Sequence, residues 1–250
     1  MSDHTRPSHT QPVPDYAAIT AELADRAGFL TGLRATTFFD AEPSSTLALD
    51  DATVAPVSLS STARSTFLAS ADGVSASLAL AGDTVAVFSL LRASLESAAV
   101  TIWLLESDDP AVRATRLLSE VWGDIRDSDR LATALGGALE SLSEQERGWT
   151  AAHTAVFGDA DPSARQMPTS MASKVDVAAG VVADFTRVPN AAAVIRASWQ
   201  AFGSLSRGRS EAFDVTDEAQ AIVAGSRSLV LDLLETAASL YHVRAVAAGD

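Results

Sequence analysis

The segment VAVFSLLRASLESAAVTIWLLE, residues Val85–Glu106, is the one around which we expect the rest of the chain to pack. It lacks Gly and Pro and is apolar on almost every side of a helix, which is typical of a helix surrounded by protein. Two charges interrupt it, Arg92 and Glu96, whose spacing of four places them on one side, with Trp103 near that side two turns later. Ionised groups at mid-membrane would cost roughly 2.5–3.5 kcal/mol each. The segment therefore predicts the centre of a helical bundle and no membrane span.

The composition of the chain allows a large buried core and argues against anionic partners. Its 250 residues are 47% hydrophobic, which is enough for one large domain. With 32 acidic and 18 basic residues the net charge is −14, and such a field repels nucleic-acid phosphates and anionic lipid. We therefore expect no membrane partner, and no nucleic acid unless a local basic patch overrides the average.

Cysteine is absent from the chain, which excludes disulfides, thiolate metal sites and cysteine nucleophiles. The first residues, MSDHTRPSHTQPVP, contain no apolar run that could form the core of a signal peptide, so we expect a cytoplasmic protein. They are polar and carry three prolines, which predicts a disordered arm over residues 1–14. Residues 15–250 are expected to form a single helical domain, with 158–168 as the place where it could be divided.

Apolar periodicity, capping residues and breakers divide this domain into seven or eight helices. Residues 40–56 are rich in Pro, Ser, Thr and Asp and are predicted to form a long loop, with a short strand over 53–59 as an alternative. Gly136-Gly137 is expected to break or bend a long helix. No set of alternating strands is evident, so the predicted fold class is an all-α bundle. The predicted helices cover residues 15–38, 60–80, 85–106, 110–136, 139–157, 169–185, 190–208 and 216–247.

Sequence motifs of the common nucleotide, hydrolase and zinc sites are absent. Two of the four histidines, His4 and His9, lie in the arm, so we predict no histidine cluster, no metal site and no cofactor. The Arg92/Glu96 pair has two interpretations. It is either an ion pair that fixes the register of neighbouring helices, or a polar pocket in which burial raises the proton affinity of Glu96 for acid–base catalysis. We favour the ion pair, because structural ion-pair networks also perturb proton affinities.

Four short motifs lie between residues 85 and 210: Arg92-Ala-Ser-Leu-Glu96, Trp103-Leu-Leu, Pro168-Thr-Ser and Trp199-Gln-Ala-Phe-Gly-Ser-Leu-Ser-Arg207-Gly208. Together they resemble a family of uncharacterised bacterial all-helical proteins. In that family an Arg-x-x-x-Glu helix pairs with a later helix that carries an aromatic residue and a terminal His-Gly. The resemblance implies a polar core pocket of Arg92, Glu96 and Arg207. Arg207 replaces the histidine of the family while Gly208 is kept, which argues against catalysis by that histidine here.

That family is distantly similar to HEPN domains, helical bundles that often act as ribonucleases through an Arg-x(4–6)-His motif. The segment Arg147-Gly-Trp-Thr-Ala-Ala-His153 matches the motif, so the resemblance implies that Arg147 and His153 are catalytic. Gly148 stands where these domains usually have a polar residue. The net charge of −14 is also unfavourable for an RNA-cleaving site.

Three functions are compatible with these patterns. The first is a non-enzymatic interaction protein that forms a homodimer through a helix face, because long helices such as 216–247 offer more apolar surface than one groove absorbs. The second is a HEPN-like ribonuclease, active or degenerate, centred on Arg147 and His153 with the polar core pocket nearby. The third is an acidic partner that neutralises a basic protein, for which the net charge is the argument. We favour the interaction protein.

Overall fold

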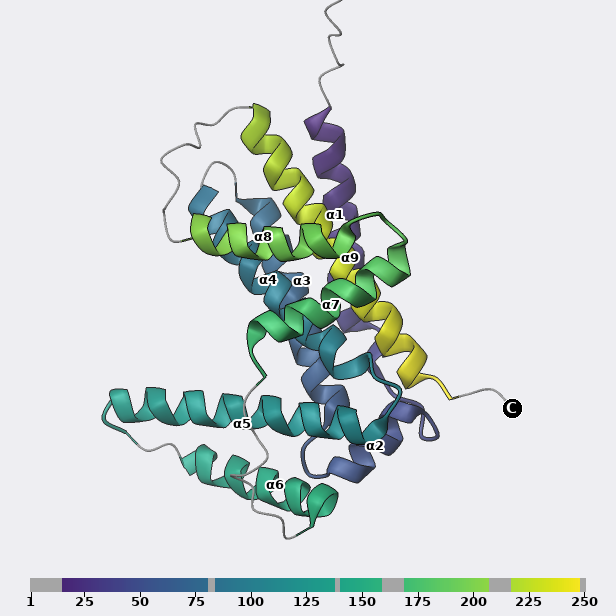
Figure 1. Ribbon diagram of the computed structural model, residues 1–250, viewed down its shortest axis with the longest axis vertical. Helices are drawn as coiled ribbons and strands as arrows, with labels where there is room; N and C mark the ends of the chain where they lie inside the picture. The colour runs from purple at the N-terminus through teal and green to yellow at the C-terminus, as the bar shows by residue number, and fades with distance from the viewer. Residues whose placement is uncertain (1–14, 81–83, 138–139, 159–168, 207–216, 248–250) are drawn as a thin grey trace, which may run out of the picture.

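The computed structural model describes residues 15–80, 84–137, 140–158, 169–206 and 217–247. These residues are almost entirely helical and contain no strand, which confirms the predicted all-α fold (Figure 1). Within them there are nine α-helices, so the expected count of seven or eight is too low, and two short 3-10 helices, η1 (Leu33–Ala35) and η2 (Thr37–Phe39). The α-helices are α1 (Tyr16–Gly32), α2 (Thr46–Val54), α3 (Leu59–Ala79), α4 (Thr84–Leu105), α5 (Pro110–Ala134), α6 (Glu140–Phe157), α7 (Met171–Thr186), α8 (Ala191–Leu205) and α9 (Asp217–Ala245).

Helix α4 occupies the centre of the molecule, as its apolar sequence predicted. It packs against α3, α9, α7, α8 and α5. Leu95, Val100 and Leu105 point in three different directions around its axis, and all three are buried. By length and composition α4 is the one helix among the described residues that could cross a membrane, but 56% of the apolar window is buried inside the protein. Such burial is typical of the core helix of a bundle.

Helices α3 and α4 lie side by side and approach each other closely at Gly73. A Cβ atom at this position would overlap the Oγ of Ser94, so a larger residue requires a shift of that side chain. One turn earlier, the hydroxyl of Ser70 donates a 2.7 Å hydrogen bond to the Ser94 carbonyl. The glycine lowers the intrinsic helix propensity of α3 but allows the two helices to pack tightly.

The predicted loop over residues 40–56 is wrong in its central part, where α2 forms. A helix of nine residues is marginal by itself, so its stability comes from tertiary contacts. One of these contacts is an ion pair between Asp50 of α2 and Arg113 of α5. The guanidinium donates hydrogen bonds of 2.7 and 2.9 Å to the two carboxylate oxygens, and both side chains are buried. This pair joins residues far apart in the sequence, which is why local pattern did not predict α2.

Two further expectations near the N-terminus are corrected. The alternative strand over residues 53–59 does not form, because α2 occupies its first residues and α3 its last. The first helix ends at Gly32 instead of near Phe38, and η1 and η2 follow it. The change of direction brings Phe39 into the core, where its ring packs edge-on against Tyr241 with 5.0 Å between centroids. Burial of this aromatic pair stabilises the segment that follows α1.

Helices α5 and α6 form a hairpin that projects from the main core, toward the lower left of Figure 1. The hairpin has a small hydrophobic cluster of its own, and α6 also packs against α2. Helix α5 ends just before Gly136, whose φ of +75° reverses the chain, so the predicted break at Gly136-Gly137 is confirmed. The cluster consists of Leu118, Ile125, Trp149 and Ala152.

Three arginines from other helices lie at the carboxyl end of α4. Arg116 donates a 2.5 Å hydrogen bond to the carbonyl of Trp103. Arg113 and Arg244 donate to the carbonyl of Ser107 at 2.6 and 3.1 Å. Cations at this end complement the helix dipole and satisfy carbonyls that lack an intrahelical partner. They also hold α5 and α9 against the end of the central helix.

The hydroxyl of Tyr241 is buried and donates a 3.0 Å hydrogen bond to the carbonyl of Phe39. Burial, with a smaller contribution from Asp51, raises the pKa of Tyr241 to about 12. In an unfolded chain the pKa of tyrosine is about 10, so the stability that this phenol contributes is complete below about pH 10 and is lost as the pH rises through about 12.

We expect Tyr241→Phe to be less stable than wild type by about 1 kcal/mol near neutral pH. The difference in free energy of unfolding between wild type and Tyr241→Phe should shrink and then reverse in alkaline solution. Denaturant unfolding at a series of pH values measures it.

The control for this experiment is Tyr16→Phe, which removes the other tyrosine of the chain, at the start of α1. If wild type and Tyr241→Phe lose stability in parallel over the alkaline range, the buried phenol is not responsible for the pH dependence.

Candidate functional site

Arg92 and Glu96 lie on the side of α4 that packs against α8. The Nε of Arg92 donates a hydrogen bond to Oε1 of Glu96 at 3.0 Å, so the two residues do contact each other. Their side chains are 29% and 26% exposed. The pair is therefore partly exposed to solvent at the contact between the two helices.

Trp199 of α8 completes a three-residue cluster, Arg92, Glu96 and Trp199, which we call the α4–α8 clamp. Its indole Nε1 donates a 2.8 Å hydrogen bond to the same Oε1 of Glu96. The guanidinium carbon of Arg92 lies 5.7 Å from the centroid of the Trp199 ring, within cation–π distance. Gly203, one turn further along α8, leaves the space for this guanidinium, because a Cβ there would overlap it. The aromatic partner of the pair is thus Trp199, whereas Trp103 contacts cations of α5 and α7.

The clamp joins the first and last of the four motifs that were singled out in the sequence. One oxygen of Glu96 accepts hydrogen bonds from both an indole and a guanidinium, an arrangement that holds two helices together. A catalytic carboxyl needs in addition a cavity in which a substrate can lie. Two surface hollows of the described residues lie away from Glu96, one on α6 and one beside Trp103. Arg207, the third residue of the predicted pocket, lies outside the described residues.

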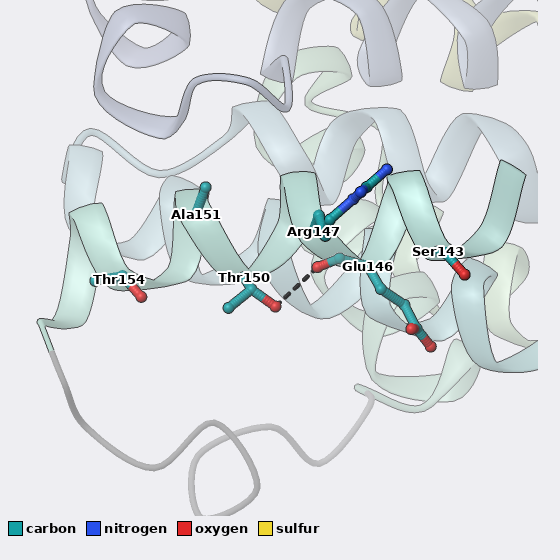
Figure 2. A pocket seen from close by; sticks show the side chains of 6 residues that line it. All are labelled: Ser143, Glu146, Arg147, Thr150, Ala151 and Thr154. Carbon is teal, nitrogen blue, oxygen red and sulfur yellow. Dashed lines mark hydrogen bonds between the residues drawn. The ribbon is translucent and has the colours of Figure 1, made fainter.

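Arg147 and His153 both belong to α6 but do not converge. Arg147 is exposed and lines a surface hollow of about 680 Å³ (Figure 2). His153 is 1% exposed, and its ring lies 5.1 Å from that of Trp149 and 5.0 Å from that of Phe157. Six residues along a helix correspond to a rotation of roughly 600°, which turns the two side chains to different sides. The hollow is lined by one face of α6, with Ser143, Glu146, Arg147, Thr150, Ala151 and Thr154.

The two groups of predicted site residues lie apart in the molecule. Helix α6 packs mainly against α5 and α2 at the bottom of Figure 1, whereas the clamp lies between α4 and α8 in the upper half. A histidine buried among aromatic rings is also not accessible to an RNA substrate in this conformation. The geometry therefore adds no support to the ribonuclease hypothesis, which stays a prediction.

A cation cluster around Trp103 was not predicted from the sequence. Lys174 Nζ lies 4.9 Å and the Arg116 guanidinium carbon 5.5 Å from the centroid of its ring. Lys174 is buried and forms an ion pair with Glu120. The pKa of the nearby Asp124 is raised, first by burial of its own carboxyl group and then by the negative charge of Glu120. The cluster ties α4, α5 and α7 together. A single lysine in an arginine-rich chain is the one signal that could have indicated this position. Beside it is a hollow of about 380 Å³ lined by Trp103, Ala111, Val112, Thr115, Arg116 and Thr169.

Within the part of the chain that the structure describes, no three His, Asp or Glu side chains gather as they would around a metal ion. Comparison of the chain with family models, curated proteins and solved structures finds no match. The resemblance to the Arg-x-x-x-Glu helical family, and through it to HEPN domains, stays a prediction.

Proposed function

We propose that this protein is a non-enzymatic interaction protein that self-associates as a homodimer. The observation that carries the proposal is the exposure of three large apolar residues at the end of α7, in the turn after it and at the start of α8, which we call the apolar corner. Phe185, Val188 and Val194 are 61%, 55% and 51% exposed. Contact of large apolar side chains with water costs about 25 cal/mol per Å² of apolar surface. Association recovers this free energy, and neighbouring exposed apolar side chains are typical of interaction sites.

This apolar surface is not on the helix that the sequence suggested. Helix α9, within residues 216–247, packs its apolar side against α4, α1 and α3. Its side chains Val230, Leu233 and Leu234 are fully buried, so the core of the same chain absorbs them. Two large apolar side chains of α9 stay exposed, Ile222 at 39% and Val243 at 68%, near its two ends. We propose the apolar corner between α7 and α8 as the contact surface, because three such residues lie there within ten positions of the sequence.

The use of the polar residues also supports an interaction protein over an enzyme. Glu96 is held by Arg92 and Trp199, and Asp50 is held by Arg113. Each of these groups joins two segments of the fold and so has a structural role. The alternative of an acidic partner for a basic protein rests on the net charge of −14 and stays a prediction.

Sedimentation velocity over a range of protein and salt concentrations tests the proposal. We expect a species of twice the 26.0 kDa chain mass whose stability changes little with salt, because an apolar contact is not screened. A species of 26.0 kDa under all conditions contradicts self-association. A dimer that dissociates steeply as salt rises contradicts an apolar contact and points to paired charges.

A further inference from the structure

We infer that the outward side of the α7–α8 hairpin is a two-fold interface with a second copy of this chain. The inference rests on the proposed self-association and adds the extent and the symmetry of the contact surface. Helices α7 and α8 pack against each other and against α4, and both lie at the front of the molecule in Figure 1. We call the exposed residues of α7, of α8 and of the turn between them the hairpin face.

The first argument is the sequence of α8. On its inward side Ile195 and Phe202 are buried against the core. On its outward side Arg196 is the only charged residue. Four of the seven exposed residues of α8 are Ala or Val, and small or apolar side chains allow a second layer of protein to pack against a helix. The other exposed residues of α8 are Ala193, Val194, Ala197, Gln200, Ala201 and Ser204.

The second argument is the balance of charge on the hairpin face. Its exposed acids are Asp176 and Asp184, and its exposed bases are Arg187 and Arg196. Asp176 and Arg196 already form a pair at 2.6 Å that is about half exposed. The remaining charge of the two helices, Lys174, is buried. Since the whole chain carries −14, the excess of acids lies outside this face.

The balance of charge indicates which partner the face suits. Across a two-fold axis a face meets its own copy, so a face with the average charge of this chain would repel itself. A face with equal numbers of acids and bases can instead pair each base with an acid of the copy. A strongly basic protein would be attracted to the acidic remainder of the surface, and anionic lipid would be repelled by the overall field. The second copy is thus the partner that fits both the apolar and the charged residues.

The α4–α8 clamp holds this face in place. Trp199 is fixed through its bond to Glu96 and its contact with Arg92, so α8 is anchored to the central helix at mid-length. A surface that is rigid before binding loses less conformational entropy when it binds. The clamp therefore stabilises the interface by fixing the position of α8, and not by contact with the second copy.

The test introduces an acidic or a basic side chain at Val194, the most exposed large apolar residue of α8. In Val194→Glu and in Val194→Lys, two like charges are brought together across the axis, and we expect the dissociation constant of each dimer to rise by about 100-fold. Mixing the two variants places opposite charges together, so a mixed dimer should form with an affinity near that of wild type. Because Val194 is 51% exposed, both variants should keep their helical circular dichroism. Sedimentation velocity of each variant and of the mixture measures the result.

The matched control is Leu135→Glu, at the end of α5, where the side chain is 79% exposed. This variant should dimerise like wild type. If wild type is a monomer, the proposed self-association fails together with the inference. If wild type is a dimer and both Val194 variants dimerise equally well, only the inference is overturned, and loss of the dimer in Leu135→Glu would move the interface to α5. If a Val194 variant loses helical content, Ala197→Glu and Ala197→Lys replace the pair in the same mixing test.

Discussion

Replacing Arg113 with methionine is expected to lower the free energy of unfolding by about 3–5 kcal/mol. Arg113 is 1% exposed and donates to both carboxylate oxygens of Asp50, whose side chain is 7% exposed. Methionine fills a similar space but leaves the carboxylate buried and without its cation, and the cost of that uncompensated charge accounts for the large effect. Denaturant unfolding monitored by circular dichroism measures the change. Hydrogen exchange should show the greatest loss of protection in α2, because the ion pair holds this short helix.

Two variants separate the effect of burial from that of losing an arginine. Arg130→Met breaks the pair with Asp127, whose side chains are 67% and 76% exposed, and should cost no more than about 1 kcal/mol. The double variant Asp50→Leu with Arg113→Met removes both charges and should recover most of the lost stability. If the double variant is as unstable as Arg113→Met alone, lost packing is the cause and the buried charge is not.

Replacing Trp199 with alanine is expected to destabilise the protein by about 2–4 kcal/mol. The indole donates a 2.8 Å hydrogen bond to Glu96 and lies against the guanidinium of Arg92, so the variant removes both contacts of the clamp. The loss should be local, since Trp199 is the polar anchor of α8 on α4. Hydrogen exchange followed by mass spectrometry should therefore show faster exchange in α8 than in α3 or α9, and the dimer should weaken as well.

The chain offers close controls for this prediction. Trp199→Phe keeps an aromatic ring but loses the donor, and should cost about 1.5–3 kcal/mol because the acceptor is a carboxylate. Trp122→Ala removes a half-buried tryptophan in the α5–α6 hairpin, where it packs 4.5 Å from Trp149. It should destabilise the hairpin without faster exchange in α8. Equal exchange in α8 for the Trp122 and Trp199 variants would show that the clamp does not anchor that helix.

Much of the fold was predictable because its signals act over a few residues. The start of α5 follows from Asp109, whose carboxylate accepts a hydrogen bond from Ala111 N at 2.8 Å, and from Pro110 in the first turn. The start of α7 follows in the same way from Ser170, which caps the helix by accepting from the backbone N of Ser173. Caps and breakers of this kind lie within one turn of the boundary that they set, so sequence alone can locate them.

The candidate site was predictable only in part. The spacing of Arg92 and Glu96 placed the two side chains on one side of a helix, and the structure shows them in contact. The spacing could not identify Trp199 as their partner, because that contact joins residues 103 positions apart. Nor could it show that His153 is buried among aromatic rings while Arg147 is exposed. Which side of a helix is buried depends on the elements packed against it.

The sequence is sufficient to predict an all-α fold with α4 at its centre, because a long segment that is apolar on almost every side is unfavourable in water. Three other features follow only from the tertiary structure: the formation of α2, the assembly of the clamp and the balanced, apolar hairpin face. The first depends on Asp50 meeting Arg113, the second on Glu96 meeting Trp199, and the third on which residues of α7 and α8 stay exposed. The physical reason is the same for each. Periodicity gives the direction of a side chain relative to its own helix, whereas burial and pairing depend on the position of every other helix.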